Sequence, residues 1–157
     1  MNKYKILEDQ YVEVCGKKLY RVQALKDFGG VKAGDTGGYI ESESNLSQSG
    51  NAWVHGNAQV SDDARVSGDA RVSGNAKVSS TRHYLNLGPI GSRDGYTTIY
   101  RNKNKKAIVV CGCFHGDLDK FERAVHKTHA GTIYEAEYMA LIQLARLREK
   151  EWLDEVD

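Results

Sequence analysis

A short segment, GPIGSR at residues 88–93, combines residue types that suit the binding of a phosphate group. Its two glycines let the backbone approach a ligand closely, while the serine and the backbone amides can donate hydrogen bonds to phosphate oxygens. Its arginine adds a planar fork that can hold two oxygens at once. A threonine and a second arginine on the following strand extend the site if their side chains turn towards it. The candidate ligand-binding residues are Gly88, Gly91, Ser92, Arg93, Thr98 and Arg101.

The same glycines also suit a corner that only joins one part of the chain to the next, because a tight Gly-Pro corner needs backbone freedom for its own sake. The structural interpretation of residues 88–93 therefore stays open beside the binding one.

Cysteines and histidines near the C-terminus form a second candidate constellation. Cys111 and Cys113 share one face of a strand, and His126 and His129 share one face of a helix. Their C-x-C and H-x-x-H spacings are not among the strong zinc spacings, and no acidic partner marks His129 as the base for a thiol nucleophile. We therefore expect no metal and no cofactor. Whether these four residues form another kind of site stays open.

A six-residue repeat at residues 50–79 is the element around which the chain is organised. No helix has a period of six. Within each unit an alanine and a valine lie two residues apart and face the same side of a short strand, and Gly-Asn or Gly-Asp pairs then allow a sharp corner. The valines expected to point inward are Val54, Val60, Val66, Val72 and Val78.

The residues between alanine and valine face the opposite side of each short strand and are expected to meet water. Trp53 is the largest of them. An exposed tryptophan suggests a surface for self-association. The complete set is Trp53, Gln59, Arg65, Arg71 and Lys77.

This repeat resembles the hexapeptide repeat of left-handed parallel β-helices. In that family three hexads make one triangular coil, so the resemblance implies that residues eighteen apart stack. Val54 would lie under Val72, and Trp53 beside Arg71. Earlier rungs at Ile40 and Leu46 continue the pattern, with a two-residue insertion before Gly50.

Many hexapeptide-repeat proteins are acyltransferases that bind coenzyme A between trimer-related helices and use a histidine as general base. The resemblance implies assembly into a homo-oligomer, by analogy a trimer. Within the repeats of this chain His55 is the histidine available for such a role. The repeat is short, so acyl transfer is the alternative rather than the leading hypothesis.

Alternating patterns before and after the repeat complete the expected architecture. Residues 11–15 and 18–25 predict a hairpin that caps the repeat, and residues after 82 predict strands at 83–87, 97–101 and 107–114 followed by two helices. Asp117 and Thr132 have the sequence context of helix N-caps. The expected fold is mainly β with an α+β C-terminal part: a hairpin cap (1–37), a short left-handed parallel β-helix (38–80) and a ββαα module (81–157).

The order of these segments is also recognisable. A leader LYRVQALKDFGGVKAGDTGGYIESESNLS, hexads of NAxVxG type, GPIGSR, a hairpin, GCF and two helices together resemble small proteins of bacteriophage and prophage genomes. The resemblance implies architecture and a phage context, without assigning an activity.

Composition narrows the functional classes. The 157 residues carry a formal net charge of +1 and are 40% hydrophobic, which argues against general nucleic-acid binding because phosphate affinity is driven by an excess of Lys and Arg. The sequence contains neither a signal-peptide pattern nor an apolar run long enough to span a bilayer.

Three cysteines leave one unpaired. We expect reduced thiols and a location in the cytoplasm of the bacterial host.

The leading expectation is a non-enzymatic phage-type binding protein. It would counteract host defence by sequestering a phosphate-bearing nucleotide signal or by blocking a host effector protein. The alternatives are a hexapeptide-repeat acyltransferase and a structural or assembly protein of the phage.

Overall fold

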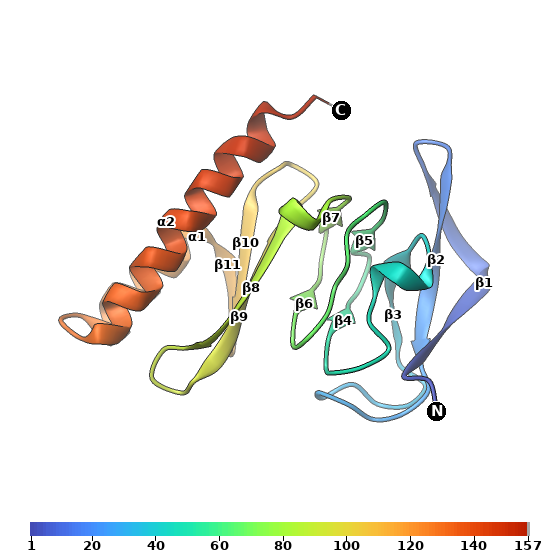
Figure 1. The fold of residues 1–157 in the computed structure, drawn as a ribbon, viewed down its shortest axis with the longest axis horizontal. Coiled ribbons are helices and arrows are strands. Elements are labelled where there is room, and N and C mark those ends of the chain that lie inside the picture. The colour runs from blue at the N-terminus through green and yellow to red at the C-terminus, as the bar shows by residue number, and fades with distance from the viewer. Residues whose placement is uncertain (157) are drawn as a thin grey trace. The chain divides into compact units, whose positions relative to one another are not determined.

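The computed structural model describes residues 1–156 and divides the chain into two compact units, one ending at Thr81 and one beginning at Arg82. The protein is mainly β, with two helices at its C-terminal end (Figure 1). This confirms the predicted fold class at the level of its secondary structure.

The first unit begins with an antiparallel hairpin of β1 (Tyr4–Val14) and β2 (Lys17–Ala24). Cys15 and Gly16 both have positive φ in its turn. The hairpin is longer than predicted, because the tyrosine that opens β1 is anchored by a 2.7 Å hydrogen bond from its hydroxyl to the Leu46 carbonyl. Strand β3 (Thr36–Ile40) pairs antiparallel with β2 and parallel with the repeats, so the hairpin occupies the open edge of the first rung.

The repeats form two-residue strands joined in parallel ladders. In one ladder Val54 pairs with Val72, and in another Val60 pairs with Val78, so the partners are eighteen residues apart as predicted. An isolated bridge between Leu46 and Val66 lies on a third face. The strands are β4 (Trp53–Val54), β5 (Gln59–Val60), β6 (Arg71–Val72) and β7 (Lys77–Val78).

The predicted two-residue insertion is visible in the register. Tyr39 pairs with Gln59 and Leu46 pairs with Val66, which are both separations of twenty residues rather than eighteen. The extra residues therefore lie between Leu46 and Trp53. A short 3-10 helix, η1 (Glu43–Asn45), precedes them.

The inward assignment of the repeat side chains is confirmed. All five predicted valines are at most 1% exposed, and the five alanines are at most 2% exposed. Ile40 and Leu46 are also fully buried and continue the same core towards the N-terminus.

The expectation that Trp53 faces solvent is wrong. Its side chain is 2% exposed, and its ring makes edge contacts with Tyr4 at 6.2 Å and with Phe28 at 5.3 Å between ring centroids. Gly37 leaves room for it, because a Cβ there would lie 2.7 Å from the tryptophan ring. The leader folds back over β4, and the exposed surface offered as a reason for self-association does not exist.

The second unit is an antiparallel four-stranded sheet with the order β11-β10-β9-β8. The sequence analysis predicted one strand over 107–114, whereas the chain turns at Gly112, which has positive φ, and makes two strands. The short 3-10 helix η2 (Thr81–His83) precedes the sheet. The strands are β8 (Tyr84–Ile90), β9 (Gly95–Arg101), β10 (Ala107–Cys111) and β11 (Phe114–Asp117).

Two helices pack on this sheet, α1 (Leu118–His129) and α2 (Ile133–Asp154). Both predicted N-caps are confirmed: Asp117 accepts a hydrogen bond from the Lys120 amide at 2.8 Å, and Thr132 accepts one from the Glu135 amide at 3.4 Å. The predicted inner stripe of α2 is buried throughout and consists of Tyr138, Leu141, Ile142, Ala145 and Trp152.

Candidate functional site

The predicted phosphate-binding segment forms the end of β8 and the turn into β9. Ile90 pairs with Gly95, and the turn between them contains Gly91 and Asp94, both with positive φ. The Gly91 amide donates a 3.0 Å hydrogen bond to the Glu137 carboxylate of α2. An anion at this turn would therefore find the Gly91 amide already satisfied and a negative charge beside it.

Four of the six predicted residues lie together at this turn. Gly91 is buried and packs so closely on the Tyr138 ring that a Cβ would overlap it. Gly88 is likewise required by packing, because a Cβ there would lie 2.5 Å from the Tyr96 ring. Ser92 and Arg93 are exposed at the tip. The structural need for both glycines is thus explicit, and the two side chains at the tip remain accessible.

The other two predicted residues do not join the site. Thr98 donates a 3.0 Å hydrogen bond to the Asn86 side chain on the neighbouring strand. Arg101 is six residues along β9 from Gly95, which at about 3.4 Å per residue is roughly 20 Å from the turn. The guanidinium of Arg101 forms a 2.6 Å ion pair with Glu155. The strand runs away from the turn, so one ligand of nucleotide size at the turn would not reach this ion pair.

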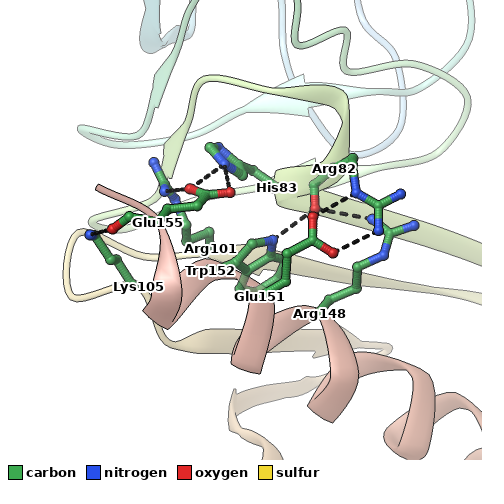
Figure 2. Close-up of polar contacts among 8 residues, drawn as sticks. All are labelled: Arg82, His83, Arg101, Lys105, Arg148, Glu151, Trp152 and Glu155. Atoms are coloured by element: carbon green, nitrogen blue, oxygen red, sulfur yellow. Dashed lines mark hydrogen bonds and ion pairs between the residues drawn. The ribbon is translucent and has the colours of Figure 1, made fainter. Parts of the chain in front are cut away.

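Figure 2 shows the polar cluster to which Arg101 belongs. The Glu155 carboxylate accepts from Arg101 and lies 3.0 Å from the His83 Nε2, while Lys105 donates to the Glu155 backbone carbonyl at 2.6 Å. On the neighbouring turn of α2, Glu151 makes a two-pronged ion pair with Arg82 at 2.6 and 2.7 Å.

The backbone of this cluster is bound as well as its side chains. The Trp152 indole donates a 2.8 Å hydrogen bond to the Arg82 carbonyl, and Arg148 donates to the same oxygen at 3.1 Å. The ion pairs of Arg101 with Glu155 and of Arg82 with Glu151 match opposite charges. Together with the bonds to the Arg82 carbonyl, they join the end of α2 to the segment that leads into β8. We interpret the cluster as a structural one that stabilises the position of α2 on the sheet.

The cysteines and histidines near the C-terminus are distributed among different contacts. Cys111 accepts a hydrogen bond from Thr97 at 3.2 Å and lies 3.7 Å from the Tyr138 hydroxyl, whereas Cys113 is exposed. Burial, followed by the neighbouring thiol, raises the pKa of Tyr138. Among the described residues, no group of three His, Cys, Asp or Glu side chains could hold a metal ion.

The two helical histidines lie in different surroundings. His126 sits between two carboxylates, Glu135 at 3.0 Å and Glu122 at 3.6 Å, and the hydrogen bond to Glu135 raises its pKa. His129 stacks on the Tyr138 ring with centroids 5.6 Å apart. These contacts account for both histidines as surface and packing groups.

His55, the histidine of the repeats, lies at the corner that follows β4. Its backbone amide donates a 2.7 Å hydrogen bond to the Val72 carbonyl on the next coil, which fixes its place on the ladder. The side chain is half-buried. Burial and then the positive charge of Arg71 lower the pKa of the imidazole, and the Asp35 carboxylate opposes this shift. A lowered pKa favours the neutral imidazole, which is the form that can accept a proton.

The sequence analysis did not place any loop beside His55. Residues 25–35 return along the repeats, where Phe28 contacts Trp53 and Gly29 packs on Asn51. The loop is ordered by Asp27, which accepts a hydrogen bond from the Ala33 amide at 2.9 Å. The Asp and Gly residues clustered in this segment predict a loop, but they do not indicate which part of the repeat the loop contacts.

The first unit also carries a shallow groove of about 630 Å³ over the hairpin. Both signs of charge line it, together with two tyrosines, and no periodicity in the sequence pointed to it. Its lining residues are Asn2, Tyr4, Lys5, Ile6, Glu8, Lys18, Tyr20, Glu41 and Glu43. Within the described residues, neither α1 nor α2 is long and apolar enough to cross a membrane.

Comparison with known proteins gives one partial likeness. No family model matches the chain. An uncharacterized acetyltransferase of Escherichia coli (strain K12), YdcK, is 40% identical to it over 62 residues, which make up 35% of this chain and 19% of YdcK. The chain thus spans about a fifth of that protein. The likeness is distant and partial, and the bacteriophage context remains a prediction.

Proposed function

We propose that the protein is a hexapeptide-repeat acyltransferase in which His55 is the general base. The observation that carries this proposal is the half-buried His55 at a repeat corner, bordered by the 25–35 loop, where burial and Arg71 lower the pKa of its imidazole and Asp35 opposes them. The partial likeness to a protein named as an acetyltransferase supports the same class of reaction.

The proposal includes the architecture of the repeat. Two parallel ladders have partners eighteen residues apart, and the bridge on the third face has partners twenty apart because it spans the two-residue insertion. This is the arrangement expected of a left-handed parallel β-helix in which three hexads complete a coil. A corner of such a coil is a rigid support, because the adjacent Val54 and Val72 are both buried and the corner amide is hydrogen-bonded. A rigid support is what a general base needs.

In the proposed reaction the donor is an acyl thioester such as acetyl-coenzyme A, and the acceptor carries a hydroxyl or amine. The His55 imidazole removes the acceptor proton as its oxygen or nitrogen attacks the thioester carbonyl. The carbon–sulfur bond then breaks, and the imidazolium returns the proton to the leaving thiolate. Asp35 stabilises the transient imidazolium. On the bordering loop, Lys26 is exposed and offers positive charge to a phosphate-bearing donor, whereas Lys32 already pairs with Asp27 at 3.1 Å.

The test has a binding arm and a turnover arm. Calorimetric titration with coenzyme A measures donor binding, and release of free thiol from acetyl-coenzyme A in the presence of small amines and alcohols measures transfer. His55→Ala should reduce turnover about 10²–10⁴-fold with donor affinity retained, because removing a general base costs about that much. His126→Ala, a histidine in the second unit, is the matched control. Absence of coenzyme A binding, or equal thiol release by His55→Ala, would rule the proposal out.

A second candidate function, the binding of a phosphorylated small molecule, is favoured by the tip of the β8–β9 turn. Ser92 and Arg93 are exposed there, and in the described part of the chain neither side chain makes a hydrogen bond or ion pair. In a phage context such a site would sequester a nucleotide signal of host defence, and a host effector protein is the other ligand we envisage. A role in phage assembly stays the remaining alternative.

Titration with linear and cyclic nucleotides and ADP-ribose derivatives tests this candidate. Arg93→Ala should weaken binding roughly ten- to a hundredfold, because a hydrogen bond to a charged group contributes about 1.5–3 kcal/mol. Arg123→Ala removes an exposed arginine from α1 and serves as the control. If no nucleotide binds below millimolar concentration, the turn is only a corner.

A further inference from the structure

The outer side of α2 carries an apolar stripe that its own unit leaves uncovered. Its inner stripe packs on the sheet, yet the opposite side exposes Ile133 by 68%, Leu144 by 38% and Leu147 by 59%. Ala136 and Ala140 lie between them and are also exposed. At 3.6 residues per turn these five residues form one continuous stripe about 21 Å long. A surface helix of a monomer is normally polar on this side.

We propose that this stripe is the contact surface between two copies of the chain, whose α2 helices pack antiparallel about a two-fold axis near Gln143. Such an interface is isologous, so the stripe has to complement itself. With the axis near Gln143, Leu147 of one copy falls between Ala136 and Ala140 of the other. A large side chain then meets two small ones, as knobs-into-holes packing requires.

The charges beside the stripe favour the antiparallel direction. Glu137 and Arg148 lie on the same flank of the helix, eleven residues apart. A two-fold axis near Gln143 sets Glu137 of each copy opposite Arg148 of the other. A parallel pair would instead set Arg148 near Lys150 of the other copy, so that like charges meet. Glu137 already bonds the Gly91 amide and Arg148 the Arg82 carbonyl, which holds both side chains on this flank.

The proposal concerns a different surface from the repeats and does not depend on acyl transfer. The trimer suggested by resemblance to hexapeptide proteins would form through the repeats, whereas this contact joins chains in pairs through the second unit. Leu147→Glu is therefore informative whether or not the repeats also assemble.

Sedimentation and native mass spectrometry of the full chain at micromolar concentration are the first test. We expect an even-numbered assembly whose copy number is halved by Leu147→Glu. Leu153→Glu is the matched control, because Leu153 is 47% exposed but lies more than a quarter-turn away from the stripe. Ala140→Gln provides a second disruption if Leu147→Glu fails to give a folded protein by circular dichroism. A monomeric parent, or disrupted variants with the parent's mass, would overturn the proposal.

Crosslinking tests the direction of the helices. In a Cys15→Ser, Cys113→Ser background, Gln143→Cys should be joined to its counterpart by a short bismaleimide, since both lie at the axis. Ile133→Cys should not, because antiparallel packing puts the two copies of this residue at opposite ends, about 30 Å apart. Efficient crosslinking through Ile133→Cys would overturn the antiparallel arrangement.

Discussion

The substitution Trp53→Arg tests whether residue 53 is buried, as in the structure, or exposed, as the repeat pattern predicts. Arginine is the residue at the stacked position, Arg71, so the substitution keeps the sequence pattern intact. In the structure, however, Trp53 is 2% exposed against Tyr4 and Phe28. Losing a buried tryptophan costs about 3–5 kcal/mol. Its two aromatic contacts account for about 0.5–1.5 kcal/mol each within such a loss.

Urea unfolding followed by circular dichroism and by tryptophan fluorescence measures the effect. The second tryptophan, Trp152, lies in the other unit and reports that unit in the variant. Gln59→Arg is the control, since Gln59 occupies the same position within its hexad but is partly exposed. We expect it to change the unfolding free energy by less than about 0.5 kcal/mol. If Trp53→Arg is equally mild, the leader does not cover this face of the repeat.

Three further perturbations test other parts of the fold. Val66→Asp should unfold the first unit or abolish soluble expression, because an unpaired carboxylate would enter a fully buried site; an unchanged thermal transition would contradict the inward assignment. Gly91→Ala should lower the melting temperature of the second unit, since the position has positive φ and its Cβ would overlap Tyr138, and a melting curve equal to the parent's would show that the turn can move. Burial lowers the pKa of Lys3 from 10.5 to about 8, and the nearby charge of Lys26 adds to this shift. Between these two pH values the unfolded chain binds more protons than the folded one. The free energy of unfolding should therefore rise with pH across this window, by up to about 3 kcal/mol. Denaturation from pH 7 to 10.5 measures this rise, and Lys3→Met should remove it.

Local periodicity accounts for the part of the fold that could be predicted. Alternation within a hexad already determines that Val54 and Val72 point the same way, and a repeat of eighteen then stacks them. The caps at Asp117 and Thr132 are equally local, because each bonds an amide three residues further on. Such contacts involve only neighbours in sequence or in the repeat.

The failures involve partners far away in the sequence. Periodicity could not reveal that Phe28 reaches Trp53, or that Asp35 comes near the imidazole of His55. Arg101 was assigned to a ligand, but a carboxylate 54 residues later, Glu155, binds its guanidinium. In each case the side chain was identified correctly as notable, and its environment was supplied by another segment.

The eighteen-residue ladder also limits how such a chain can change in length. Inserting or deleting three hexads preserves the face on which every later residue lies, so Val78 would still stack on an inward valine. A change of one hexad moves all later residues to the next face, and a change of two residues is accommodated only at a corner, as between Leu46 and Trp53. Natural relatives with longer or shorter repeats should therefore differ in steps of eighteen residues wherever the segments on either side are retained.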